Sequence, residues 1–171
     1  IDSSRYGNKI QYGLQAAGRG EEIIRGGDLN NEEENRIRRE ILSYRGFEQR
    51  DLLFKGIPKK IKWEKGSLPI KKLLEYKFAN CPPWVEMTQG TRLIGKIRSA
   101  FESHIAMIAS DIEKGKKFEP IIAIKDTSGK DTYLLEGHSR AAAYALTADE
   151  NMNDLQIIRG EVDDLSSWQF I

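Results

Sequence analysis

Two short apolar runs, a glycine and an alanine-rich segment follow one another in the last third of the chain. Residues 120–124 are almost entirely apolar and predict a buried strand. Residues 127–130 have the composition of a turn, and residues 132–135 predict the returning strand. Gly137 comes next, and the small side chains of residues 141–146 predict a helix that packs closely on its neighbours. This order of elements predicts a small α/β (α+β) domain in which helices cover a mixed sheet.

The middle of the chain adds strands and helices to this domain. Residues 60–64 alternate in the manner of a strand with one covered face, and residues 68–70 predict a short strand that enters a helical turn. Apolar side chains recur at spacings of mostly three and four from Leu93 to Ile112, which predicts one long amphipathic helix. Gly115 is placed to end that helix.

Two further features of the domain concern its prolines and its last strand. Pro82 and Pro83 predict that residues 80–84 are not regular helix, because each proline lacks a backbone donor. Residues 155–158 together with Val162 predict a final strand. The domain is therefore expected to occupy residues 60–171.

Residues 1–59 are predicted to be an N-terminal arm and helical extension. Residues 1–29 are rich in glycine and show no sustained period. A helix is expected from Asn30 or Asn31, with three glutamates in its first turn and Gly46 at its end. Residues 47–54 predict a second short helix. The extension could mediate formation of a homodimer or cover a site as a lid.

Composition narrows the classes of partner. The formal net charge of +1 does not favour bulk attraction to DNA, although local basic clusters leave DNA binding open. No apolar run reaches the ~20 residues that cross a bilayer, so no membrane partner is expected. Cys81 is the single cysteine, which predicts a reducing, cytoplasmic setting and a structural role for its thiol. Two histidines and one cysteine cannot build a structural zinc site.

The residues Glu136, Gly137, His138, Ser139 and Arg140 join the predicted strand to the predicted helix. Glycine permits a sharp turn and a close approach by a ligand, and the unpaired N–H groups that open a helix attract anions. Arg140 adds a bidentate donor suited to phosphate, Ser139 a hydroxyl, and His138 a donor that can become cationic. The alternatives are that His138 or Ser139 only caps the helix and that Arg140 only pairs with a carboxylate. Together these residues predict a phosphate-binding turn.

Residues 133–144, with the sequence Tyr-Leu-Leu-Glu-Gly-His-Ser-Arg-Ala-Ala-Ala-Tyr, resemble the nucleotide-binding box of the ParB/sulfiredoxin superfamily. Residues 118–122 resemble the strand that precedes this box, and the likeness covers residues 60–162. It implies a ParB/sulfiredoxin-like fold with a nucleotide held by its phosphates. In this superfamily, partition proteins of the ParB type bind CTP, sulfiredoxins use ATP, and free-serine kinases transfer a phosphoryl group to a small hydroxyl compound.

The branches of the superfamily differ in this box. Partition proteins typically show Gly-Glu-Arg-Arg, and sulfiredoxins carry a catalytic cysteine where this chain has His138. The serine-kinase-like branch typically reads Asp-Gly-His-x-Arg, which is the closest match. This resemblance implies catalytic roles for Glu136 and His138, and phosphate contacts from Gly137, His138, Ser139 and Arg140. It implies ATP or ADP with Mg²⁺ as cofactors, ahead of CTP, and a small hydroxylated metabolite as substrate. For the acidic residue that these kinases carry upstream, Glu64 and Glu86 are both candidates.

Residues 83–92 are a second candidate segment. Thr91 precedes the predicted long helix, so Thr91 and Arg92 are predicted to contact phosphate. Trp84 could stack on a base or substrate ring, with Glu86 beside it as a second substrate contact, or Trp84 could simply anchor a half-buried loop. His104 lies near the apolar face of the same helix and is interpreted as a satisfied interior or boundary histidine.

Two classes of function follow from these residues. The first is an ATP- or ADP-dependent kinase-like phosphotransferase that acts on a small metabolite. The second is a ParB-like module in which nucleotide binding controls association with DNA or protein, or a related nuclease. The near-neutral charge and the lack of a DNA-reading motif favour the first.

Overall fold

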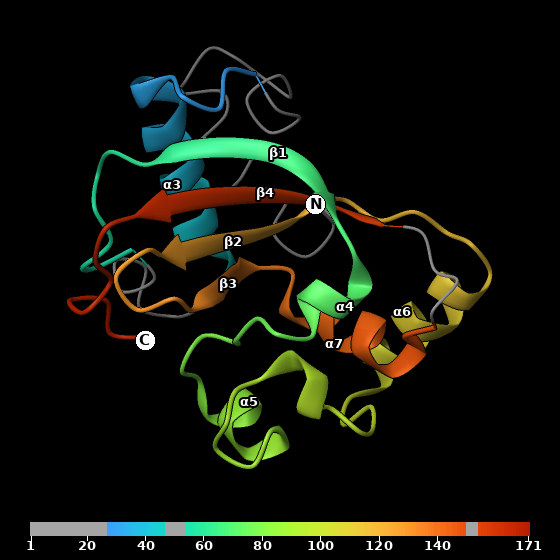
Figure 1. Cartoon of the computed structure of the whole chain (residues 1–171). Coiled ribbons are helices and arrows are strands. Elements are labelled where there is room, and N and C mark those ends of the chain that lie inside the picture. The colour runs from blue at the N-terminus through green and yellow to red at the C-terminus, as the bar shows by residue number, and fades with distance from the viewer. Residues whose placement is uncertain (1–26, 47–53, 150–153) are drawn as a thin grey trace.

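The computed structural model describes residues 27–46, 54–149 and 154–171 (Figure 1). In that part of the chain, four strands form one mixed sheet: β1 (Lys62–Leu68), β2 (Ile121–Asp126), β3 (Thr132–Glu136) and β4 (Leu155–Val162). Their order is β1-β4-β2-β3. β4 pairs antiparallel with β1 and parallel with β2, and β2 pairs antiparallel with β3. The predicted α/β class with a mixed sheet is therefore confirmed, while the specific ParB/sulfiredoxin-like fold stays a prediction.

One face of the sheet is covered by α4 (Ile70–Leu73), α6 (Ser103–Glu113) and α7 (His138–Thr147). Figure 1 shows these three helices grouped beside the sheet. Parallel neighbours such as β2 and β4 cannot be joined by a tight turn, and here β3 and α7 lie between them in the chain. The alanines at 141, 142 and 143 are fully buried, and α7 packs closely on α6. The expected small-residue helix is confirmed.

The opposite face of the sheet packs against the C-terminal segment. Strand residues alternate between the two faces, so that Leu134 lies in the first core cluster while Tyr133 and Leu135 lie in the second. Leu165 and Trp168 complete this second cluster and are almost fully buried. Ile57, which belongs to the predicted extension, also packs in it.

Sequence patterns located most of the elements of the last third correctly. β2, the turn at residues 127–130, β3, α7 and β4 all form where expected. The end of α6 is also confirmed, because Gly115 adopts a φ of 80° just after the helix. Its N–H donates to the carbonyl oxygen of Ile112 (2.8 Å), and the N–H of Lys116 donates to that of Asp111 (3.0 Å). This pair of bonds is a Schellman motif.

The predicted long helix from Leu93 to Ile112 is wrong in its first half. Only a short 3₁₀ turn, η1 (Ile94–Lys96), forms before α6 begins at Ser103. The backbone of this segment pairs with another part of the chain instead: the N–H of Ile94 donates to the carbonyl oxygen of Tyr76 (3.0 Å), and that of Gly95 to Leu74 (3.0 Å). Ile94 and Ile97 are buried by this pairing. Their helical spacing therefore reflects tertiary packing.

The expectation that residues 80–84 are not regular helix holds for residues 80 and 81 and is wrong for residues 82–84. The short helix α5 (Pro82–Met87) begins at the first of the two prolines. Both prolines lie in its first turn, where backbone N–H groups have no partner inside the helix in any case. The prediction assumed that the missing N–H groups of the two prolines would destabilise a helix, but in the first turn no helical hydrogen bond is lost.

The described part of the extension contacts the sheet edge. α3 (Glu32–Gly46) starts and ends as expected, and the side chain of Asn31 caps it by accepting from the N–H of Glu34 (3.0 Å). Asn30 exchanges side-chain hydrogen bonds with the backbone of Trp63 at the free edge of β1. β1 itself begins two residues later than predicted and extends to Leu68. The predicted arm before residue 27 and the helix predicted at residues 47–54 lie almost wholly outside the described residues.

Candidate functional site

The turn between β3 and α7 places a left-handed glycine before an uncapped helix end. Gly137 has φ 92° and ψ 24°, and no side chain caps the helix. The first helical bond is the one from the N–H of Ala141 to the carbonyl oxygen of Gly137 (2.8 Å). The N–H groups of residues 138–140 precede it and thus have no acceptor within α7. This helix end has the polarity that favours an anion.

Gly137 is also required by packing. A Cβ atom at this position would lie 2.8 Å from Cγ2 of Ile121 and 3.1 Å from Nη2 of Arg140. The contact with Ile121 is shorter than a Cβ atom tolerates, the contact with Arg140 is tight, and the left-handed backbone independently disfavours any other residue. The turn can therefore keep this shape only with glycine.

Arg140 is held beside the turn by two oxygens. Its Nη1 donates to the carbonyl oxygen of Glu119 (2.6 Å), and its Nη2 lies 3.6 Å from Oε1 of Glu136. Only 16% of the Arg140 side chain and 24% of the Glu136 side chain are exposed. The carboxylate pairing that was the alternative for Arg140 is thus present in the molecule. A phosphate at the turn would compete with Glu136 for this guanidinium.

The His138 ring contacts the aromatic rings of Phe78 and Trp84. Its ring centroid is 5.9 Å from that of Phe78 and 5.6 Å from that of Trp84. Nε2 is buried and has no hydrogen-bond partner. Burial lowers the pKa of His138 to about 4, while the nearby Glu136 carboxylate raises it and Arg140 lowers it by smaller amounts. The ring is therefore neutral at pH 7, not the cation that the sequence reading allowed.

Ser139 meets a pair of residues that the sequence reading did not connect with it. Its Oγ lies 2.9 Å from Nε2 of His104, and Nδ1 of the same ring lies 2.9 Å from Oε2 of Glu102. Of the two alternatives for His104, the interior one is wrong, because 46% of its side chain is exposed; a boundary histidine with a partner at each ring nitrogen fits the structure. No local pattern links residues 104 and 139, since the contact depends on the packing of α6 against α7.

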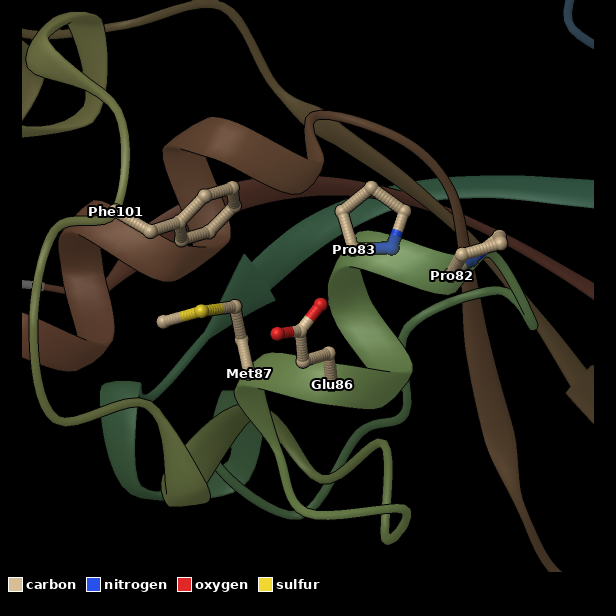
Figure 2. A pocket seen from close by; sticks show the side chains of 5 residues that line it. All are labelled: Pro82, Pro83, Glu86, Met87 and Phe101. Atoms are coloured by element: carbon tan, nitrogen blue, oxygen red, sulfur yellow. The ribbon is translucent and has the colours of Figure 1, made fainter.

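A pocket of about 340 Å³ opens beside α5 (Figure 2). Its lining residues are Pro82, Pro83, Glu86, Met87 and Phe101. Figure 2 shows the Glu86 carboxylate among these apolar side chains. Phe101 contacts Trp84 edge to face, at 5.2 Å between ring centroids, and Trp84 in turn contacts His138. The pocket is therefore linked to the turn by a continuous set of aromatic contacts, and Trp84 itself packs as a half-buried anchor on Phe78.

The structure does not bring Thr91 and Arg92 to this turn. No helix begins at Thr91, so the backbone N–H groups that follow it do not form a helix N-terminus that could bind phosphate. The hydroxyl of Thr91 donates to the carbonyl oxygen of Thr88 (2.8 Å). Nη1 of Arg92 donates to the carbonyl oxygen of Phe170 (3.2 Å), and the guanidinium lies over the ring of Tyr133. Tyr133 is near the start of β3, whereas Gly137 follows the end of that strand.

Glu64 lies away from the turn, and the thiol of Cys81 is not activated. Glu64 is on β1, which the sheet order separates from β3 by three strand spacings, or about 14 Å. It pairs there with Lys62 (3.0 Å). Cys81 is buried, and burial raises the pKa of its thiol, which disfavours the nucleophilic thiolate. Of the two upstream acidic candidates, only Glu86 is connected to the turn.

Within the described ranges, no group of three or more His, Cys, Asp or Glu side chains is placed to hold a metal ion. None of the helices in this part of the chain is long and apolar enough to span a membrane. In comparisons with known proteins, no family model, no curated protein and no solved structure matches this chain. The resemblance of residues 133–144 to the ParB/sulfiredoxin nucleotide-binding box therefore stays a prediction.

Proposed function

We propose that this protein binds a nucleotide by its phosphates at the turn of residues 137–140 and is an ATP- or ADP-dependent phosphotransferase of the kinase type. The observation that carries the proposal is the uncapped start of α7, with Gly137 in a left-handed conformation and Arg140 held beside it. Backbone N–H groups and one guanidinium supply directional donors and a positive charge to the same small volume. This is the combination that phosphate oxygens require.

The remaining residues of the turn have separate parts in the proposal. His138, being neutral, would donate or accept a hydrogen bond instead of supplying charge. The Glu136 carboxylate pairs with Arg140, and it fits the orienting of a substrate hydroxyl or a contact to Mg²⁺ that arrives with the nucleotide. Mg²⁺ would neutralise charge on the phosphates, and metals bound in this way need only one or two protein carboxylates.

The pocket beside α5 suits a small substrate. Its volume of about 340 Å³ is close to the lower end of ligand pockets, roughly 300–1,000 Å³. Its apolar walls carry a single carboxylate, that of Glu86, which can accept a hydrogen bond from a hydroxyl group. A small hydroxylated metabolite is the substrate class that these features favour.

The direct test is calorimetric titration of the purified chain with ATP, ADP and CTP, each with Mg²⁺. Preferential binding of ATP or ADP would support the proposal and justify a screen of small hydroxylated metabolites as phosphoryl acceptors. Preference for CTP would favour the ParB-like switch, in which case DNA binding would be measured with and without CTP. Absence of binding by all three nucleotides would refute the proposal.

Arg140→Ala is expected to weaken nucleotide binding by about 2 kcal/mol, or about 30-fold in Kd, because it removes a charged donor to phosphate. The same titration measures the effect. Arg36→Ala is the matched control, since it removes an equal charge from α3, where the arginine side chain is 63% exposed. The melting temperature without ligand must be measured in parallel, because Arg140 also bonds Glu119. Equal affinities in the two variants would exclude Arg140 from the phosphate site.

Glu136→Gln is expected to retain nucleotide binding and to lose phosphoryl transfer by about 100-fold, the lower range of losses when a group that accepts a proton is removed. The amide keeps the size of the carboxylate and can still accept a hydrogen bond from Arg140, but it is not a base. The measurement is ADP release with the acceptor found in the metabolite screen. Unchanged turnover would remove Glu136 from the catalytic assignment.

A further inference from the structure

We infer that Glu102, His104 and Ser139 form a nucleophilic triad, in which Ser139 attacks carboxylic esters. Three side chains from two separate segments meet in one hydrogen-bonded line: Oε2 of Glu102 to Nδ1 of His104 (2.9 Å), and Nε2 of His104 to Oγ of Ser139 (2.9 Å). This is the order of carboxylate, imidazole and hydroxyl that activates serine in hydrolases of unrelated folds. The inference uses neither the nucleotide nor its binding.

When the His104 ring acts as a base, the carboxylate of Glu102 determines which of its nitrogens carries the proton. An ionised Glu102 can only accept a hydrogen bond, so Nδ1 must be the donor in the bond between them. Nε2 is then unprotonated and can only accept, which makes the Ser139 hydroxyl the donor. The proton that a nucleophilic serine must lose therefore already points at the base that would take it.

The position of Ser139 supplies the second requirement, which is a site for the negative charge that develops on the substrate. Ser139 is the second residue of α7, so its own N–H belongs to the first turn and has no acceptor within the helix. The N–H of a nucleophilic serine is one of the oxyanion-hole donors in chymotrypsin-type proteases. Here the left-handed residue of the turn is Gly137, two positions before the serine.

The apolar pocket beside α5 gives the acyl group a place to bind. Phe101 lines this pocket and directly precedes Glu102 in the chain. The pocket is linked to His138, the residue before Ser139, through the contacts of Phe101 with Trp84 and of Trp84 with His138. Short, apolar acyl chains are the substrates that this volume and lining favour.

In the reaction, Ser139 Oγ bonds to the carbonyl carbon of the ester while its proton moves to Nε2 of His104. The bond from that carbon to the alkoxy oxygen breaks, and the alcohol leaves with the proton from His104. Water then loses a proton to His104 and attacks the acyl group, which frees the carboxylic acid and returns the proton to Ser139. Because about half of the His104 and Glu102 side chains is exposed, we expect a weaker activation of serine than in buried triads.

The test is covalent labelling with a fluorophosphonate probe, in which Ser139 Oγ bonds to phosphorus and fluoride leaves. We expect one label per chain, located at Ser139 by peptide mapping, and slow hydrolysis of p-nitrophenyl butyrate by the unlabelled protein. Ser139→Ala should abolish both, while Ser99→Ala, at an exposed serine outside the triad, should change neither. His104→Ala should slow labelling at least about tenfold, and Glu102→Gln by less.

Three results would overturn the inference: labelling of the wild type no faster than that of Ser139→Ala, a label on another residue, or equal labelling rates in wild type and His104→Ala. Melting temperatures of the variants separate loss of activation from loss of fold. Labelling is independent of the calorimetric result, so a chain that binds no nucleotide can still carry the triad. Conversely, nucleotide binding without labelling would leave only the phosphate site.

Discussion

Gly137→Ala is expected to lower the free energy of unfolding by about 3 kcal/mol, which is a large share of the stability of an ordinary domain. A left-handed φ of 92° costs a residue with a Cβ atom about 1 kcal/mol. The added methyl group would also lie 2.8 Å from Cγ2 of Ile121, which is almost fully buried, and overpacking of this kind costs about 1–3 kcal/mol. The measurement is unfolding in urea, followed by circular dichroism.

Gly90→Ala separates the two causes. Gly90 has a similar φ of 81°, but nothing lies within 4 Å of the position that its Cβ atom would take. This control should therefore lose only about 1 kcal/mol, the cost of the backbone conformation. If the two variants lose equal amounts, the close packing of the turn against Ile121 does not contribute, and the helix start is less rigid than the structure indicates.

Acid is expected to destabilise the protein through His138 by about 3 kcal/mol between pH 7 and pH 4. Burial lowers the pKa of this ring to about 4 in the folded chain, against about 6.5 when unfolded. As the pH falls below 6.5 the unfolded chain takes up a proton that the folded chain does not. The stability that the neutral ring contributes is thus fully present above pH 6.5 and is lost as the pH falls towards 4.

His138→Phe provides the comparison for this effect. Phenylalanine keeps a ring against Phe78 and Trp84 but cannot take up a proton. Urea unfolding of wild type and variant at several pH values between 4 and 7 should give a smaller loss for the variant, by about 3 kcal/mol at pH 4. The other ionisable groups of the chain are common to both proteins, so their contributions cancel in the difference. Parallel pH profiles would show that the ring is not desolvated.

The effect also bears on phosphate binding. A phosphate near His138 would favour the charged ring and raise its pKa, so binding would draw a proton from solution at mildly acidic pH. In the ligand-free protein the positive charge of the site belongs to Arg140 alone among the residues of the turn. This is why the Arg140 variant is the sharper test of the proposed site.

The elements that were predicted correctly are those whose signals are local. The two apolar runs around residues 121–136, the glycine at 137 and the alanines of α7 each act on neighbouring backbone, through burial, left-handed conformation and close helix packing. The Schellman end of α6 at Gly115 is also local, since its two bonds span only a few residues. Local propensity and tertiary packing agree in these segments, so the amino-acid pattern was sufficient.

The residues of the proposed phosphate site could likewise be identified from the sequence, because residues 136–140 are consecutive. The protonation of His138 and the partner of Arg140 could not be predicted in this way. The pKa of His138 depends on the rings of Phe78 and Trp84, which come from a distant part of the chain. The engagement of Arg140 depends on the backbone of Glu119, 21 residues away. Local sequence thus put His138 and Arg140 in the turn, and tertiary packing determined the charge of His138 and the hydrogen-bond partner of Arg140.

Tertiary structure alone decided the path of residues 93–102 and the surroundings of Ser139. Helical spacing favoured a long helix, but pairing with residues 74–78 satisfies the same backbone groups and buries the same isoleucines, so the local preference lost to long-range contacts. His104 and Ser139 are 35 residues apart and meet because α6 packs on α7. A backbone group that can bond either within a local helix or to a distant segment takes the partner that gives the better-packed core. Local sequence spacing alone therefore does not predict which of the two bonds forms.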